Sequence, residues 1–192
     1  MKAWRMLTLC VSITAMLIVS GCGGKLENPL NWEIEAFSYS NQDGKTVGLK
    51  ELKDKVWIAD FIFTSCETVC PPMTANMMKL QEMLAKEEIN DVTFVSFSVD
   101  PEVDKPDVRK DFMKNYDFGK AKWHFLGDYS QQEIQEFAMK NFQTPVSKPK
   151  NNSQVIHGTS FYLVDQSGKV VKKYSALNVP YEEIIKDIQT IQ

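Results

Sequence analysis

The chain of 192 residues is poor in cysteine, histidine and arginine, of which it has four, two and two. So few cysteines exclude a disulfide-rich scaffold. The formal net charge is −3, and no block of basic residues or zinc-knuckle spacing occurs, so we do not expect nucleic acid as a partner. No internal repeat or low-complexity segment is present either. What remains is an ordinary globular composition with a small number of chemically active side chains.

The first part of the chain has the layout of an export signal. Two basic residues precede an apolar run over residues 6–19, which is too short for a comfortable membrane span. The run ends in residues 19–22 (VSGC), which resemble a bacterial lipobox. We therefore expect a signal peptide over residues 1–21 and an acylated, for example palmitoylated, Cys22 that anchors the domain on the extracytoplasmic side of the cell membrane. An ordinary signal peptide, or an uncleaved anchor, would also place the domain outside the cytoplasm.

The rest of the chain has room for one domain. Residues 22–31 have the composition of a linker, and residues 32–192 are enough for a single well-buried core. Only Cys66 and Cys70 remain in this part. A structural disulfide between them would close a loop of about five residues and contribute roughly 2 kcal/mol at best. A chemical role is therefore favoured over a structural one.

The pattern of apolar residues predicts an alternation of strands and helices. A small hairpin is expected to open the domain, from residues 32–39 and a turn at residues 41–45. The expected strands are then residues 55–63, 92–99 and 123–126 and the hairpin 160–164 with 169–174, and the expected helices are residues 71–87, 105–116, 130–141 and 181–191. This order indicates an α/β protein with a mixed central sheet flanked by helices. A cysteine pair between the first core strand and its helix is the thioredoxin-like arrangement.

The two cysteines suit both redox chemistry and metal binding. Cys70 is expected near the start of the helix that Pro71 and Pro72 open, with Cys66 in the preceding loop. The positive end of the helix lowers the pKa of a cysteine, and the thiolate is both the nucleophile and the metal ligand. The spacing C-x-x-x-C is looser than the C-x-x-C of thioredoxin-like redox enzymes, which favours metal weakly.

His157 is the expected third ligand. It lies just before Gly158, which stands where thioredoxin-like folds usually have a cis-proline facing their cysteines. An imidazole there could face both sulfurs. Two thiolates and an imidazole suit copper, as Cu(I) or Cu(II), whereas zinc usually requires a fourth ligand.

Four ordered motifs resemble those of the Sco family of copper-binding, thioredoxin-fold proteins of cytochrome c oxidase assembly. They are residues 63–71 (FTSCETVCP), 98–104 (SVDPEVD), 123–126 (WHFL) and 157–165 (HGTSFYLVD). The resemblance implies that Cys66, Cys70 and His157 ligate copper and that the partner is the copper-binding subunit of the oxidase. Many members have proline at the position of Glu67 and use a transmembrane helix where this chain is expected to carry a lipid.

Several other residues have a plain structural role as an alternative to a functional one. Asp100 is expected either to orient a metal ligand by contacting it or to cap the turn before Pro101. Asp104 is expected to cap the next helix. His124 is expected at the surface or sheet edge, and the methionines of residues 73–83 in the core or on the helix surface. Residues 147–153 are expected to form a solvated loop, with a partner-contact loop or a lid that moves His157 as the alternatives.

Three functions remain open on the sequence alone. The first is a copper-binding assembly factor, and the second is an extracytoplasmic thiol-disulfide oxidoreductase that reduces the oxidase's copper-ligand cysteines and is itself reset by a thiol reductant. The third, a peroxide-reducing enzyme, would need an arginine near the cysteines. Arg109 is the only arginine after residue 21 and is expected in a helix away from them.

Overall fold

The computed structural model describes residues 26–150 and 152–192. The expected signal peptide and Cys22 lie outside the described residues. Six strands form one sheet in the order β1-β10-β9-β4-β5-β6. Strands β4, β5 and β6 run parallel to one another, and β9 pairs antiparallel with both β4 and β10. The sheet is therefore mixed, as the sequence predicts.

The elements agree closely with the expected ranges. The strands of the main sheet are β1 (Trp32–Glu33), β4 (Trp57–Ile62), β5 (Thr93–Ser98), β6 (Lys122–Leu126), β9 (Ser160–Val164) and β10 (Lys169–Ser175). The helices are α2 (Cys70–Lys86), α3 (Pro106–Met113), α4 (Gln131–Phe142) and α5 (Tyr181–Ile191). Two small hairpins complete the described part: β2 (Ser38–Ser40) with β3 (Thr46–Gly48), and β7 (Val146–Ser147) with β8 (Ile156–His157).

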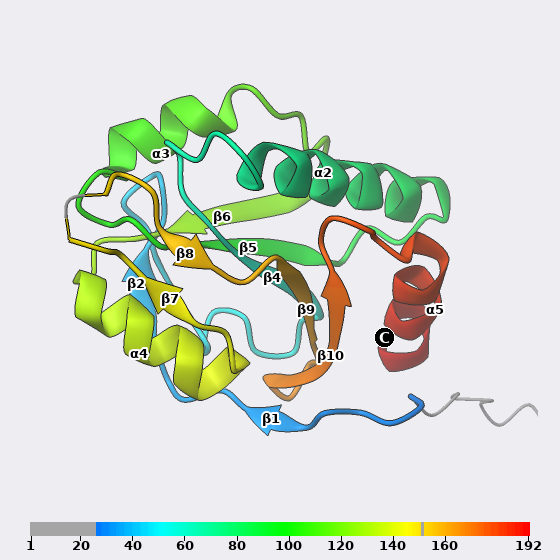
Figure 1. The fold of residues 1–192 in the computed structure, drawn as a ribbon. Coiled ribbons are helices and arrows are strands. Elements are labelled where there is room, and N and C mark those ends of the chain that lie inside the picture. The colour runs from blue at the N-terminus through cyan, green and yellow to red at the C-terminus, as the bar shows by residue number, and fades with distance from the viewer. Residues whose placement is uncertain (1–25, 151) are drawn as a thin grey trace, which may run out of the picture.

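The sheet is covered on both faces, which explains why β4 and β5 are buried along their whole length. Helix α4 lies on one side of the sheet and α2 on the other (Figure 1). On the α4 side an aromatic cluster fills the space between helix and strands. Its central members are Phe61, Phe97, Phe137 and Phe142, whose ring centroids lie 5.2–5.8 Å apart in the contacting pairs. Burial of such large apolar groups is the main stabilising contribution in a domain of this size.

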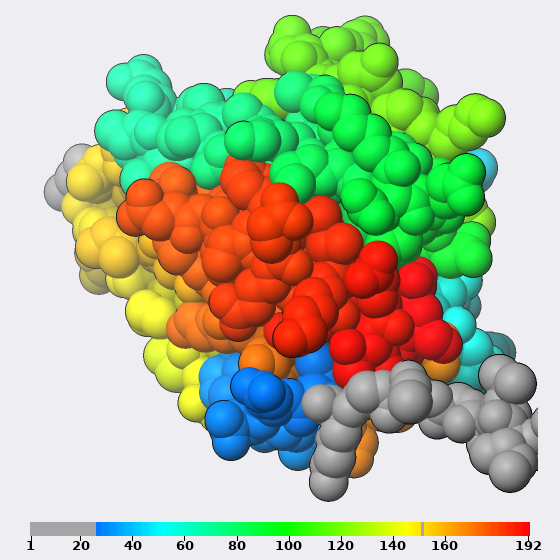
Figure 2. Space-filling model, turned by 90° about the vertical axis from the view of Figure 1, so that its right-hand side faces the viewer, coloured from blue at the N-terminus to red at the C-terminus, as the bar shows by residue number. Residues whose placement is uncertain are grey.

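The carboxyl-terminal segment packs beside α2. Figure 2 shows this segment, in orange and red, lying against the green of α2. The side chain of Asn76 on α2 donates to the carbonyl of Ala176 at 2.8 Å, and the Lys79 ammonium lies 4.6 Å from the ring centroid of Tyr181. These contacts fix α5 against the helix that carries Cys70.

Two details differ from the sequence-based expectation. The opening hairpin exists, but it is β2–β3, and Trp32 instead belongs to β1, which pairs with β10 at the edge of the main sheet. The β7–β8 hairpin was not expected. Its strands have only two residues each, which is too short for apolar alternation to be visible in a sequence.

Part of the expected linker is attached to the domain. Leu26 packs against the core, and the Leu30 N–H donates to the Val171 carbonyl at 2.9 Å. Within residues 26–150 and 152–192, no helix combines the length and apolarity that crossing a bilayer requires.

Candidate metal and redox site

Cys66 and Cys70 lie where β4 leads into α2, at the carboxyl end of the parallel strands. Val69 is the N-cap of α2, so Cys70 is the first helical residue and Cys66 lies in the preceding loop. Pro71 and Pro72 occupy the first helical turn, where an N–H would have no partner within the helix. The Cys70 N–H instead donates to the Cys66 Sγ at 3.3 Å. The start of the helix thus directs a backbone donor at the first sulfur.

His157 reaches the same place from the β7–β8 hairpin. Its Nε2 lies 3.4 Å from the Cys70 Sγ, and its Nδ1 lies 3.0 Å from the carbonyl oxygen of Gly158. A carbonyl can only accept, so Nδ1 carries the proton in this bond and Nε2 keeps its lone pair. The ring is also edge-on to Phe63, with centroids 5.7 Å apart. The imidazole therefore presents an unprotonated nitrogen to the sulfurs.

The three predicted ligands form one cluster. One ligand atom from each of Cys66, Cys70 and His157 lies within 4.8 Å of the other two. Cys70 is fully buried, Cys66 is 7% exposed and His157 is half-buried. Gly158 makes room for this arrangement, because a Cβ at that position would overlap the Thr144 hydroxyl. A glycine rather than a proline therefore follows the histidine, because position 158 has no space for a Cβ.

The two thiols have opposite pKa shifts. Burial is the largest single effect on Cys66 and raises its pKa, but hydrogen bonds from Cys70 and from the N–H groups of Thr68 and Val69 outweigh it, and the net pKa is lowered. Burial raises the pKa of Cys70, and the Cys66 sulfur raises it further. Burial also lowers the pKa of His157. In the reduced site Cys66 is thus the more acidic of the two thiols, and burial disfavours the charged forms of Cys70 and His157.

This donor set fits copper. Two sulfurs and one imidazole nitrogen are soft and borderline ligands, and they converge in a pocket that is largely closed to water. Binding through both sulfurs requires Cys70 to lose its proton, and a bound cation would compensate the cost of burying that charge. The same two sulfurs can also form a disulfide, so metal binding and oxidation compete for one pair of atoms.

Asp100 lies outside this cluster. Its carboxylate accepts from the Lys148 ammonium at 2.7 Å, and its N–H donates to the Ser98 hydroxyl at 3.2 Å. Within the described residues no hydrogen bond joins it to the two cysteines or the histidine. Lys148, which the sequence did not single out, belongs to the segment between β7 and β8. If Asp100 orients His157, it must therefore do so through Lys148 and the β7–β8 hairpin. This role of Asp100 stays a prediction.

The remaining candidates have structural positions. His124 is half-buried on the edge strand β6, where its Nδ1 lies 3.2 Å from the Asn41 amide. Met73 and Met77 are fully buried, and Met78 and Met83 pack against the core from the helix surface. The expectations for the edge histidine and for the methionines are confirmed.

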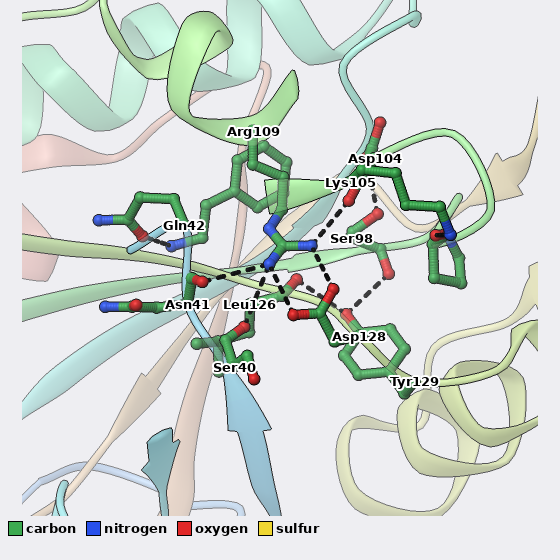
Figure 3. Close-up of polar contacts among 12 residues, drawn as sticks. Ser40, Asn41, Gln42, Ser98, Asp104, Lys105, Arg109, Leu126, Asp128 and Tyr129 are labelled. Carbon is green, nitrogen blue, oxygen red and sulfur yellow. Dashed lines mark hydrogen bonds and ion pairs between the residues drawn. The ribbon is translucent and has the colours of Figure 1, made fainter. Parts of the chain in front are cut away.

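The expectation for Asp104 was wrong. The N-cap of α3 is Lys105, which has no side-chain cap, and the Asp104 carboxylate is turned away from the helix toward Thr64. The Arg109 guanidinium, which is fully buried, bonds to Asp104, Asp128 and the β2 end of the first hairpin (Figure 3). Among the described residues, none of its hydrogen bonds goes to a cysteine. That removes the support for a peroxide-reducing site.

The chain is similar to known proteins in sequence and in fold. The family model described as SCO1/SenC matches residues 28–192. A crystal structure of a SCO1/SenC family lipoprotein from Bacillus anthracis is 57% identical, covers 87% of this chain and 99% of its own, and superposes with a TM-score of 0.83.

Two further similar structures concern a disulfide and bound copper. The structure of BsSco, described as having a disulfide switch and as a member of the Sco family of cytochrome c oxidase assembly proteins, is 53% identical with a TM-score of 0.80, covering 88% of this chain and 98% of its own. Arabidopsis thaliana ScoI with copper bound is 26% identical with a TM-score of 0.70, covering 82% and 96%.

Proposed function

This chain belongs to the SCO1/SenC family and has its thioredoxin-like fold, and from that premise we propose that it is a membrane-anchored copper-binding protein of cytochrome c oxidase assembly. The copper would be held by Cys66, Cys70 and His157 and supplied to the copper-binding subunit that forms the dinuclear copper centre. The observation that carries the proposal is the convergence of two sulfurs and one unprotonated imidazole nitrogen within 4.8 Å. Copper is the cargo in this function, and the three side chains are its carrier.

The site must bind copper tightly enough to carry it and still release it. Three protein ligands leave the metal open to a ligand from the receiving protein, so a ligand-by-ligand exchange is feasible. Cys66 is the more exposed sulfur and Cys70 the deeper one. A transfer would therefore begin from the side of Cys66 and His157.

A second function is favoured by the opposite pKa shifts of the two thiols. In a thiol-disulfide reductase, the Cys66 thiolate attacks a disulfide of the partner and forms a mixed disulfide, while one partner thiolate leaves and takes up a proton. Cys70 then loses its proton and attacks the Cys66 Sγ, which releases the second partner thiolate. The partner gains two electrons, and the Cys66–Cys70 disulfide must be reduced again by an external thiol reductant.

One complementation experiment separates the two functions. In cells that lack this protein, the wild-type chain should restore an oxidase with a dinuclear copper centre, whereas quinol oxidases without that centre should be unaffected throughout. His157→Ala removes one copper ligand and neither sulfur, so we expect it to fail to restore the oxidase and to bind copper more weakly than the wild type. Cys66→Ala should fail in both functions.

The control is the redox state of the variant. His157→Ala should still form the Cys66–Cys70 disulfide, which thiol alkylation and mass spectrometry report. Full restoration of the oxidase by His157→Ala would reject the copper-carrier proposal and favour the reductase. Equal loss of both oxidase types in the deletion strain would reject a role at the dinuclear centre altogether.

A further inference from the structure

The hydrogen bonds within the loop that carries Cys66 converge on Cys66 itself. Between β4 and α2, the Cys66 N–H donates to the Phe63 carbonyl at 3.3 Å, and the Cys66 sulfur accepts the Cys70 N–H. The loop therefore needs support from elsewhere if the first sulfur is to keep one position. Two bonds supply it: the Gln154 amide donates to the Ser65 carbonyl at 3.3 Å, and Thr64, two residues before Cys66, is bound to Asp104.

Thr64 is held by one carboxylate from another segment. Its hydroxyl donates to the Asp104 Oδ1 at 2.6 Å, and its N–H lies 3.2 and 3.3 Å from the two carboxylate oxygens. The Ser98 hydroxyl donates to the Oδ2 at 2.6 Å. Asp104 has no exposed surface. Short bonds from hydroxyl groups to a buried carboxylate are among the stronger hydrogen bonds in proteins, and they fix both partners.

Asp104 is in turn fixed by Arg109. The guanidinium donates to the Asp104 carbonyl at 2.7 Å, to the Asn41 carbonyl at 3.2 Å, and to the two carboxylate oxygens of Asp128 at 3.4 and 3.5 Å. Figure 3 shows it between these groups. Gly127 is part of the fit, because a Cβ there would overlap the guanidinium. One buried side chain thus joins the first hairpin, the segment after β6 and the segment that holds Asp104.

We infer that Asp104 is a positioning residue for Cys66, that it acts through Thr64, and that Arg109 fixes it in place. The hydrogen-bonded series Arg109, Asp104 and Thr64 then determines the distance between the Sγ atoms of Cys66 and Cys70. The expected effect on copper binding rests on the proposed function. The redox consequence of the inference is independent of copper, because the same geometry determines how readily Cys66 and Cys70 form a disulfide.

The primary variant is Thr64→Val, which keeps the shape and the N–H but removes the hydroxyl. A looser loop lowers the effective concentration of one thiol at the other, so the disulfide becomes less stable and its reduction potential rises. We expect the equilibrium constant for forming the Cys66–Cys70 disulfide to fall by about tenfold, which corresponds to a rise in reduction potential of about 30 mV for a two-electron couple. Copper affinity of the reduced domain should fall by about tenfold, the lower end for groups that support metal ligands. Thr64→Ser should restore both values.

The matched control is Tyr174→Phe. It also removes one hydroxyl-to-carboxylate bond, from Tyr174 to Asp187 at 2.8 Å, but between β10 and α5. It should lower the melting temperature and leave the potential and the copper affinity at wild-type values. Arg109→Lys keeps the charge but not the forked contacts and should shift the potential in the same direction as Thr64→Val.

The outcomes are distinct for the inference and for the proposed function. A wild-type potential and copper affinity in Thr64→Val would overturn the inference, and so would an equal change of both in Tyr174→Phe. If Thr64→Val does not fold, Asp104→Asn tests the same link, because an amide nitrogen cannot accept the bonds from the Thr64 N–H and the Ser98 hydroxyl that Oδ2 accepts. Its potential should rise in the same direction, and a wild-type potential in Asp104→Asn would overturn the inference. If the wild-type protein binds no copper, the proposed function fails, while the potentials still test the inference.

Discussion

The burial of Asp60 should make the free energy of unfolding depend on pH. Asp60 has no exposed surface in β4, and burial raises its pKa from 3.8 to about 7, an effect that the Ser96 hydroxyl offsets only in part. The folded protein therefore keeps a proton that the unfolded chain loses near pH 4. Stability should fall as the pH rises from about 4 to about 7 and then level off, by on the order of 4 kcal/mol from this group.

Asp60→Asn removes the titration while keeping the shape of the neutral acid. We expect the variant to gain stability over the wild type at pH 8 and to match it more closely at pH 4.5, as measured by urea unfolding. Other groups titrate in both proteins, so the difference between the two curves isolates Asp60. Asp91→Asn, at an exposed position, is the control and should follow the wild type. A constant difference between the Asp60→Asn and wild-type curves at all pH values would contradict this assignment.

At the scale of elements, the β7–β8 hairpin positions His157 with very little pairing of its own. Its register joins only Val146 with His157 and Ser147 with Ile156. A further tie comes from Lys148, whose ammonium contacts the buried Asp100 at 2.7 Å and the exposed Glu102 at 3.1 Å. This ion pair therefore connects the histidine's hairpin to the segment that follows β5.

Lys148→Met should loosen the hairpin and leave the Asp100 carboxylate buried without its cation. We expect a loss of about 1–2 kcal/mol, less than for a fully buried pair because Lys148 is 20% exposed, and faster amide exchange in the hairpin. Copper affinity should fall severalfold. Lys150→Met, on the same loop and exposed, is the matched control. Equal exchange rates in the two variants would show that the ion pair does not hold the hairpin.

The elements differ in how far the sequence could predict them. Helix α5 was predicted to the residue, because its apolar residues recur with a helical period, and β4 and β5 were visible as dense apolar runs. The β7–β8 hairpin could not be predicted, since two-residue strands have no period and their stability comes from distant partners such as Asp100. Asp104 was misassigned for a related reason: its position before a helix fits a cap, and only the tertiary structure brings Thr64 within its reach.

At the scale of the whole molecule, the site and the point where the chain enters lie at opposite ends of the sheet. Cys66, Cys70 and His157 lie at the carboxyl end of β4. Leu26 lies near the turn of residues 165–167, which follows β9 at the amino end of β4. Six residues of strand separate the two ends by about 20 Å. An anchor attached before Leu26 would therefore join the domain at the end of the sheet opposite to the site.

This arrangement gives the anchor and the site separate tests. We expect the mature membrane form to begin at acylated Cys22, as intact mass would show, and Cys22→Ala to move the protein into the soluble fraction. A single acyl chain binds a bilayer only marginally, so stable retention requires the several chains of a lipoprotein. Copper affinity of Cys22→Ala should equal that of the wild type, because Cys66, Cys70 and His157 are unchanged. Cys10→Ala replaces a cysteine of the expected signal peptide and should stay anchored. A membrane form with an unmodified amino terminus, or Cys22→Ala retained like Cys10→Ala, would reject lipid anchoring.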